Sequence, residues 1–273
     1  MKITLGNSCL EVLPAVGCAI NQLQFNGITI IQPKEAIEGV GMPGFHGSFL
    51  FPFPNRLANG LLAWNYSCST GKLHRHQLQF PLNEPERSNA LHGIWYHRQW
   101  NLLTLEQKPD SVEAIFQDEY SGENPSYPFP LLLQNHFRLE KNALTIKTKI
   151  ESKADILIPA GLGWHPYFQI PNPGHSFLQM DLCRQVFLDE FGRNNGVGAF
   201  ISPQPLAIHS QLDHCFEFRK LPATISILDE NLNIFTKIEL LSCNFPFTYL
   251  QIYTPPSGNE IALEPMTCPP NGM

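Results

Sequence analysis

Short stretches of alternating apolar and polar residues, separated by turn signals, constrain the fold of this chain more than any other feature. In residues 143–152, Leu144, Ile146 and Ile150 fall on one side of an extended chain, and the lysines between them fall on the other. Similar patterns occur in residues 72–80, 131–140, 224–230 and 234–240. The chain contains 24 prolines and 19 glycines and no long stretch of helical periodicity. The sequence therefore predicts an all-β protein, either a sandwich or a barrel.

The organisation along the chain favours one unit. No serine- and glycine-rich linker, compositional break or repeat of fixed period is present in the 273 residues. With 43% hydrophobic residues, the chain is long enough and apolar enough to bury a substantial core. We therefore expect a single domain over residues 1–273.

Charge and cysteine content exclude several classes of protein. The net charge is −6 and no run of lysine or arginine occurs, so we expect no nucleic-acid partner. No apolar run is long enough to cross a bilayer, and the first 18 residues lack the continuous apolar core of a signal peptide. The seven cysteines are scattered without a CxxC pair, which indicates reduced thiols in a cytoplasmic protein with no membrane association.

The segment GLGWHPYF (161–168) places one histidine among aromatic residues. Pro166 disfavours a helical conformation at His165, and in an extended segment Tyr167 shares the side of His165 while Trp164 points away. Tyr167 is therefore a candidate wall of a binding pocket, and Trp164 is expected in the core. His165 itself is either a core histidine with satisfied hydrogen bonds or a proton donor in a sugar pocket.

Two loops offer further polar candidates. The prolines of FPFPNRLANG (51–60) stiffen a non-helical path that presents Asn55 and Arg56, and the arginine could donate several hydrogen bonds to sugar hydroxyls. A surface ion pair is the alternative for Arg56. His92 precedes Gly93 in a polar loop and is either a pocket histidine or a turn histidine.

Two carboxylates stand out near strand patterns. Asp213 could accept hydrogen bonds from sugar hydroxyls, although aspartate is also common at the start of a strand. Glu264 follows the apolar residues 261–263 and precedes Pro265, so the sequence predicts it at the end of a buried strand. A carboxyl group there has a raised pKa unless it is paired, which makes Glu264 a candidate general base. The alternative is a glutamate that simply reaches solvent.

A metal site is not predicted. His74 and His76 lie two apart in a strand pattern and so share a face, which is the geometry of a two-histidine site. No third ligand is suggested nearby, and the exposed polar face of a strand has the same pattern.

Five segments of the chain, taken together and in order, resemble the aldose 1-epimerase (galactose mutarotase) family. They cover roughly residues 45 to 271 and read LFPFPNRLANG (50–60), NEPERSNALHG (83–93), GLGWHPYF (161–168), LDHCFE (212–217) and LEPMTCPPNG (263–272). Each is weak alone, whereas five in the right order are specific. The chain differs from the commoner galactose mutarotase pattern at Ile94 and Trp95, which follow Gly93.

The resemblance implies a large antiparallel β-sandwich that acts on an aldose as a monomer or homodimer, with no metal or organic cofactor. It implies Glu264 as the catalytic base and His165 as the catalytic acid. It further implies that His92 supports the ring oxygen or a neighbouring hydroxyl, and that Arg56 and Asp213 bind sugar hydroxyls. The loops of such a sandwich would bring these distant positions to one concave face.

The implied reaction suits these residue types. Interconversion of α and β anomers requires a base at the C1 hydroxyl and an acid at the ring oxygen, with the roles reversed for closure. Three alternatives remain open: a non-catalytic sugar-binding or sensing module, a hexose-phosphate mutarotase that would use Arg75, Arg87 or Arg98, and a glycoside hydrolase that would need two carboxylates such as Asp213 and Glu264.

Overall fold

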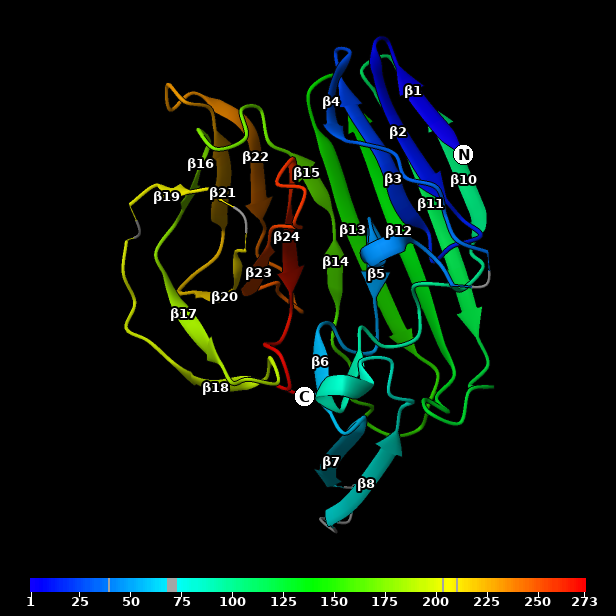
Figure 1. The fold of residues 1–273 in the computed structure, drawn as a ribbon. Coiled ribbons are helices and arrows are strands. Elements are labelled where there is room, and N and C mark those ends of the chain that lie inside the picture. Colours follow the sequence, from blue (N-terminus) through cyan, green and yellow to red (C-terminus); the bar gives the residue numbers. More distant parts are fainter. Residues whose placement is uncertain (39, 68–72, 203, 210) are drawn as a thin grey trace.

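The computed structural model describes residues 1–38, 40–67, 73–202, 204–209 and 211–273, and almost every regular element in these ranges is a β-strand (Figure 1). The helical elements described are two short 3-10 turns, η1 (Pro43–Phe45) and η2 (Pro85–Arg87). The paired strands of the sheets run antiparallel. The prediction of a large antiparallel β-sandwich is confirmed.

One half of the molecule consists of two four-stranded sheets that share a core, with strand orders β1-β2-β3-β4 and β10-β11-β12-β13 (Figure 1). Their strands are β1 (Lys2–Leu5), β2 (Ser8–Leu13), β3 (Ala19–Phe25), β4 (Ile28–Ile31), β10 (Asn101–Gln107), β11 (Ser111–Tyr120), β12 (Leu131–Glu140) and β13 (Leu144–Ser152). Alternation buries every second residue of β2 and β12, and Leu10, Phe116 and Phe137 join the common core. The strands predicted within 131–140 and 143–152 are therefore confirmed.

The other half is built on a larger sheet in the order β18-β17-β20-β23-β24-β14-β5, in which β15 also pairs with β24, and on a smaller sheet in the order β19-β16-β21-β22. The strands of the larger sheet are β5 (Ser48–Leu50), β14 (Gly163–His165), β15 (Tyr167–Gln169), β17 (Cys183–Leu188), β18 (Asn194–Val197), β20 (Asp213–Phe218), β23 (Tyr249–Tyr253) and β24 (Glu260–Met266). Those of the smaller sheet are β16 (Phe177–Met180), β19 (Leu206–Ala207), β21 (Ala223–Leu228) and β22 (Ile234–Leu240). Figure 1 shows β14 and β5 between the two halves.

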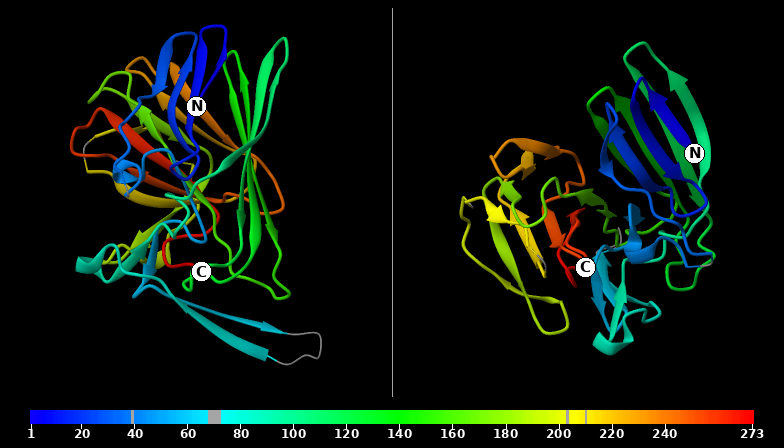
Figure 2. Two further views of the ribbon diagram at one scale, coloured as in Figure 1. Left: turned by 90° about the vertical axis from the view of Figure 1, so that its right-hand side faces the viewer. Right: turned by 45° about the horizontal axis from the view of Figure 1, so that its top comes forward.

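Two strand pairs complete the fold. The hairpin of β7 (Leu61–Ser67) and β8 (Leu73–Gln79) projects from the body (Figures 1 and 2). On this hairpin the ring of His76 stacks on Trp64, with 5.2 Å between centroids, while the side chain of His74 lies outside the described residues. The short strands β6 (Arg56–Ala58) and β9 (Asn89–Leu91) pair with each other.

The C-terminal segment is an ordered loop beside β6. The backbone N–H of Asn271 donates to the carbonyl oxygen of Arg56 at 2.7 Å, and the Asn271 side chain accepts from the N–H of Ala58 at 2.9 Å. The end of the chain therefore braces a short strand on which the sequence places a candidate binding residue.

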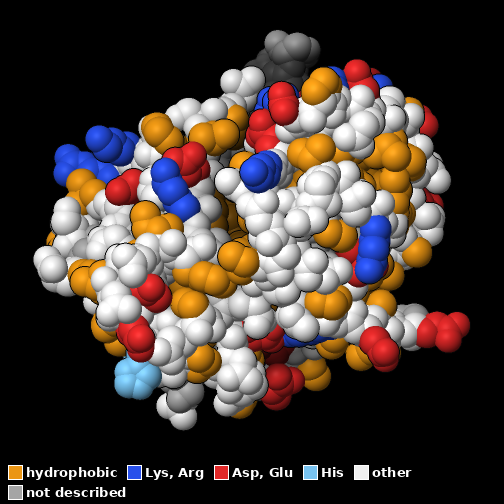
Figure 3. All heavy atoms as spheres, turned by 90° about the horizontal axis from the view of Figure 1, so that it is seen from above, with side chains coloured by type: hydrophobic (Ala, Val, Ile, Leu, Met, Phe, Trp, Pro, Cys, Tyr) orange, Lys and Arg blue, Asp and Glu red, His pale blue; other side chains and the backbone are white. Residues whose placement is uncertain are grey.

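The surface carries mixed charge. On the face shown in Figure 3, most acidic and basic side chains are interspersed with apolar ones. Among the described cysteines, Cys9, Cys18, Cys183, Cys215, Cys243 and Cys268 are free thiols, as predicted; Cys68 lies outside the described residues. No helix in the described part of the chain is long and apolar enough to cross a membrane.

Candidate functional site

Strand register brings His165 and Glu264 face to face. Both β14 and β15 pair with β24, and the pairs on either side of their interruption are Gly163 with Met266 and Tyr167 with Ala262. Between these pairs, His165 falls opposite Glu264, and opposite residues of an antiparallel pair project from the same face of the sheet. The imidazole Nε2 lies 3.3 Å from a Glu264 carboxyl oxygen, and both side chains are buried.

The position of Glu264 corrects the sequence prediction. Glu264 lies inside strand β24, which continues through Pro265 to Met266, rather than at the end of a strand that stops at Leu263. A proline lacks the N–H that a ladder needs. Backbone hydrogen bonds continue on both sides of Pro265: the N–H of Leu263 donates to the carbonyl oxygen of Pro166 at 3.3 Å, and the N–H of Thr267 donates to that of Leu162 at 2.9 Å.

A third strand contributes Gln251, which the sequence analysis did not single out. Gln251 lies on β23 directly opposite Glu264 and is 2% exposed. Its side-chain amide donates to Asp213 at 2.6 Å, and its side-chain oxygen accepts from the Asn55 amide at 3.2 Å. The signal available was one amide in the otherwise apolar and aromatic run YLQIY (249–253).

Asn55 and His92 hold each other through reciprocal hydrogen bonds. Both have left-handed backbone conformations, with φ of 58° and 64°. The N–H of His92 donates to the carbonyl oxygen of Asn55 at 2.9 Å, and the N–H of Asn55 donates to Nδ1 of His92 at 3.1 Å. Since Nδ1 accepts a hydrogen bond, the proton of the neutral imidazole is on Nε2.

The surroundings keep His92 neutral. Burial lowers the pKa of His92 well below its ordinary value, and the neighbouring His165 and Arg56 lower it further. The rings of His92 and His165 meet edge to face, with centroids 5.2 Å apart. His92 is therefore positioned as a neutral hydrogen-bond donor beside the facing pair.

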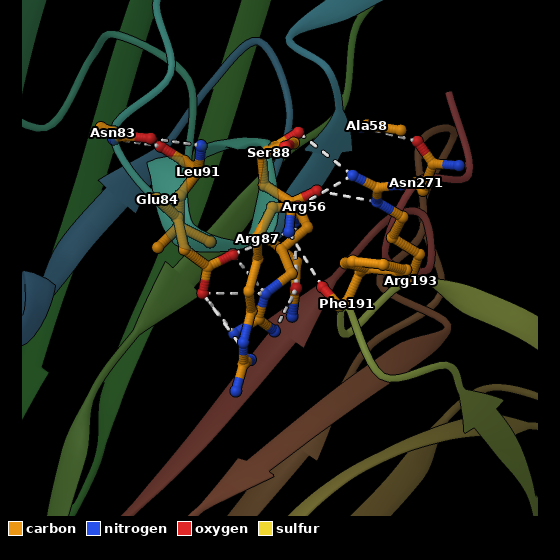
Figure 4. Close-up of polar contacts among 12 residues, drawn as sticks. Arg56, Ala58, Asn83, Glu84, Arg87, Ser88, Leu91, Phe191, Arg193 and Asn271 are labelled. Atoms are coloured by element: carbon orange, nitrogen blue, oxygen red, sulfur yellow. Dashed lines mark hydrogen bonds and ion pairs between the residues drawn. The ribbon is translucent and has the colours of Figure 1, made fainter.

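Arg56 is clamped by a carboxylate that the sequence analysis did not single out. Its Nε and one terminal nitrogen each donate to Glu84 at 2.9 Å, a two-point contact between largely buried side chains (Figure 4). Asn89 donates to the same carboxylate at 2.7 Å, and Arg193 in turn donates to Asn89 at 2.8 Å. Gly192 packs so closely that a Cβ there would lie 2.7 Å from the Arg56 guanidinium.

The electrostatic setting of the facing pair favours neutral groups. Burial raises the pKa of Glu264 well above its ordinary range, and Asp213 acts in the same direction while Arg56 opposes it. Burial lowers the pKa of His165 to about 3. One proton shared by this pair therefore resides on the carboxyl group at rest. Within the described residues, the second carboxyl oxygen of Glu264 and Nδ1 of His165 are buried without a hydrogen-bond partner.

The remaining predicted residues lie at the edges of this group. Asp213 is exposed at the start of β20 and connects to the centre through Gln251. Tyr167 shares the side of His165 as predicted, and its ring stacks on that imidazole with centroids 5.2 Å apart. Its hydroxyl already donates to the carbonyl oxygen of Gly44 at 3.2 Å. Trp164 packs against the core.

The donor set fits hydrogen bonding better than a metal ion. One ligand atom from each of His92, His165 and Glu264 lies within 4.8 Å of the others, a spacing that an ion could span. With Nδ1 of His92 accepting from Asn55, however, Nε2 carries a proton and offers no lone pair. A metal bound at that nitrogen would cost the hydrogen bond that orients the ring.

Comparisons with known proteins agree with this architecture. The model of the family described as aldose 1-epimerase matches residues 1–272. The uncharacterized protein YihR of Escherichia coli (strain K12) is 25% identical over 276 residues, which cover 94% of this chain and 80% of YihR.

Solved structures share the fold at low sequence identity. A galactose mutarotase-like protein from Clostridium acetobutylicum superimposes with a TM-score of 0.78 at 17% identity, covering 99% of this chain and 85% of that one. A galactose 1-epimerase from Lactobacillus acidophilus NCFM superimposes with a TM-score of 0.72 at 20% identity, covering 99% of this chain and 86% of that one. The family match extends over nearly the whole sequence and the shared fold is consistent with it; the chain belongs to the aldose 1-epimerase family.

Proposed function

We propose that this protein is an aldose 1-epimerase that interconverts the α and β anomers of an aldohexose, with Glu264 as base and His165 as acid. The observation that carries the proposal is the buried pair itself. A carboxyl group and an imidazole face each other at 3.3 Å, and each has one polar atom without a partner among the described residues. Polar atoms that are buried without a partner are uncommon in folded proteins, and a bound sugar could form hydrogen bonds with both of these.

The reaction needs one proton moved at each of two oxygens. The Glu264 carboxylate takes the proton of the C1 hydroxyl, while the His165 imidazolium gives a proton to the ring oxygen and the C1–O5 bond breaks. The aldehyde then rotates about C1–C2, and the two groups exchange roles as the ring closes on the other face. Such groups typically contribute about 10²- to 10⁴-fold each to the rate.

The burial of the pair places a condition on this chemistry. Ring opening converts a carboxylate and an imidazolium into a carboxylic acid and a neutral imidazole, with the total number of protons on the pair unchanged. Burial raises the pKa of Glu264 and lowers that of His165, so the surroundings favour the neutral forms that ring opening produces. The bound sugar must supply the polar contacts that stabilise the charged forms before the reaction.

The neighbouring residues take binding roles in this proposal. The Nε2–H of His92 donates to the ring oxygen or an adjacent hydroxyl, since its tautomer is fixed by Asn55. Arg56, held by Glu84, and Asp213, held by Gln251, bind sugar hydroxyls. No metal or organic cofactor takes part.

Two of the three arginines that a phosphosugar could require have other placements. Arg98 forms ion pairs with Asp118 and Glu123, and Arg75 lies on the projecting hairpin. Arg87, by contrast, has a 41% exposed side chain 3.7 Å from Glu84, the carboxylate that holds Arg56, so a hexose phosphate is the second candidate substrate. An imidazole, rather than a second carboxylate, is the partner of Glu264, which favours epimerisation over glycoside hydrolysis.

Polarimetry tests the proposal. Freshly dissolved α-D-glucose and α-D-galactose are followed with wild-type protein and with Glu264→Gln, which keeps the shape of the side chain but cannot act as a base. We expect faster relaxation of at least one sugar with wild type, and a loss of about 10²- to 10⁴-fold in the variant.

Two further outcomes would replace the proposal. If neither sugar relaxes faster than in buffer, and hexose 6-phosphates do, the protein is a phosphosugar mutarotase. If no sugar relaxes faster but aldoses bind by calorimetry, the protein is a sugar-binding or sensing module and the catalytic assignments are wrong.

A further inference from the structure

A short strap of chain, residues 41–47 with the sequence GMPGFHG, crosses the site next to the imidazoles. Its middle forms the turn η1, in which Gly44 has φ of 59° and Phe45 has φ of 56°. A positive φ is ordinary for glycine but rare for a bulky side chain, which persists there only when its surroundings hold it. The conformation of Phe45 is therefore imposed by contacts rather than by local preference.

The ring of Phe45 lies against both imidazoles of the site. Its centroid is 4.5 Å from that of His92 and 6.2 Å from that of His165, and its plane lies within 30° of the His165 ring. Phe45 is itself only partly buried, whereas both histidines are 5% exposed and Glu264 is 3% exposed. The Phe45 ring thus lies against the two imidazoles, at a residue that remains partly exposed.

Tyr167 ties this strap to the catalytic strands. Its hydroxyl donates to the carbonyl oxygen of Gly44, the residue before Phe45, at 3.2 Å. Its ring is stacked on His165 at 5.2 Å and on His46 at 5.7 Å, so the tyrosine has little freedom to move. The far end of the strap is fixed as well, because the N–H of Gly47 donates to the carbonyl oxygen of His165 at 2.8 Å.

We infer that Phe45 is a further substrate-contacting residue, which packs its ring on the apolar C–H surface of the bound sugar, and that Tyr167 is the positioning residue that holds it. The inference rests on the proposed function, because it concerns the same site. A pyranose that reaches both Glu264 and His165 lies next to the imidazole against which the Phe45 ring is packed. An aromatic surface there binds the C–H groups and excludes water, which strengthens the electrostatic interactions of the pair.

Steady-state kinetics test the contact between Phe45 and the sugar, with whichever aldose the wild-type protein accelerates more in polarimetry. We expect Phe45→Ala to raise KM about tenfold, the effect of losing roughly one well-packed apolar contact, with a smaller loss in kcat. Phe45→Tyr keeps the ring and should stay within about threefold of wild type. Tyr167→Phe removes only the hydroxyl, and we expect KM to rise in the same direction by a smaller factor. Phe187→Ala on β17, which β20 and β23 separate from β24, is the matched control and should change neither KM nor kcat.

Chemical labelling tests, without using activity, the premise that Phe45 covers the two imidazoles. Diethylpyrocarbonate modification of His92 and His165 is followed by peptide mass mapping, with the exposed His175 in the same digest as internal reference. We expect Phe45→Ala, and to a lesser degree Tyr167→Phe, to raise the ratio of labelling at the two buried histidines to that at His175, and Phe187→Ala to leave it unchanged.

The outcomes separate this inference from the proposed function. If the wild-type protein is inactive but labelling of His92 and His165 rises in Phe45→Ala, the proposed epimerase activity is contradicted, while the shielding of the imidazoles by Phe45 is supported. Unchanged KM in a folded, active Phe45→Ala variant overturns the sugar contact, and unchanged labelling overturns the cover, even where no activity is measurable. If Phe45→Ala does not fold, Phe45→Leu and Tyr167→Phe decide: unchanged labelling in both overturns it.

Discussion

At the scale of single residues, the contact between Asn55 and His92 decides which form of imidazole the site contains. A backbone N–H can only donate, so Nδ1 of His92 must accept, and Nε2 must carry the proton. The lowered pKa keeps this ring uncharged. His92 therefore differs chemically from His165, although the two are the same residue type 5.2 Å apart.

Replacing His92 tests whether it acts as a neutral hydrogen-bond donor rather than as a titrating group. We expect His92→Gln to lower kcat/KM by about 10²- to 10³-fold, the usual loss for one pre-organised donor. Because His92 is neutral throughout, the pH–rate profile of the remaining activity should keep the limbs of wild type. His92→Ala should in addition lower the free energy of unfolding by about 1 to 3 kcal/mol, since the Asn55 N–H is left without an acceptor. A pH–rate limb that disappears with His92 would contradict the neutral assignment.

Residue type made part of this site predictable. A histidine before proline, a carboxylate beside an apolar run and an Asn-Arg pair after prolines are visible in the sequence, and the structure brings all of them together. Glu84 gave no sequence signal, because it matters only through a partner that is distant in sequence, and Gln251 gave only the weak signal of one amide in an apolar and aromatic run. The catalytic and binding roles proposed for the site residues stay predictions until the variants are measured.

At the scale of elements, the turn η2 and the strands β6 and β9 form a bracket that fixes one arginine. Glu84 precedes η2, Arg56 begins β6 and Asn89 begins β9, so a single carboxylate links all three elements (Figure 4). Burial lowers the pKa of the Arg56 guanidinium, but Glu84, Asp213 and Glu264 raise it, and the net shift is upward.

Breaking the bracket should affect binding and stability together. We expect Glu84→Gln to raise KM by roughly tenfold and to lower the free energy of unfolding by up to about 3 kcal/mol, because a largely buried guanidinium loses its counter-charge. Chemical denaturation of wild type, Glu84→Gln, Arg56→Met and the double variant gives the coupling free energy between the two side chains. The double variant should be more stable than Glu84→Gln alone; simple additivity would show that the ion pair contributes nothing.

The same scale shows why strand prediction succeeded in one place and failed in another. Residues 131–140 and 143–152 alternate because one face of each strand meets the core. Strand β24 is buried on both faces, so its sequence shows no alternation of apolar and polar residues. It also contains a proline, which normally indicates the end of a strand and here does not. Its true length depends on neighbours that the sequence does not reveal. Sheet order is hidden for the same reason, since β24 pairs with segments about a hundred residues earlier.

At the scale of the whole molecule, buried histidines make stability depend on pH. Burial, assisted by Lys34 and opposed by Glu260, lowers the pKa of His46 from 6.5 to about 4. The unfolded chain therefore binds a proton between these values while the folded protein does not, so acidification favours unfolding.

We expect the free energy of unfolding to fall as pH decreases from about 6.5 to about 4, by up to about 3 kcal/mol from His46 alone. The His165–Glu264 pair adds little to this slope above about pH 4.5, because folded Glu264 keeps a proton that its unfolded form loses, and this offsets the proton that folded His165 lacks. Urea denaturation at a series of pH values measures the slope, and His46→Gln is the comparison. The variant should show a shallower dependence in this window; an identical slope would mean that His46 titrates normally in the folded protein.

The proposed acid and base occupy adjoining strands of one sheet, and this arrangement has an engineering consequence. Neighbouring strands lie about 4.8 Å apart in every protein, so the spacing of the two groups comes from a constant dimension of the polypeptide backbone. The segments that carry Arg56, His92 and Phe45 come from elsewhere in the chain and contribute no residue to this strand pair. Loop exchange with longer relatives, of which this chain covers 85% and 86%, should therefore alter sugar preference while the proton-transfer distance stays fixed.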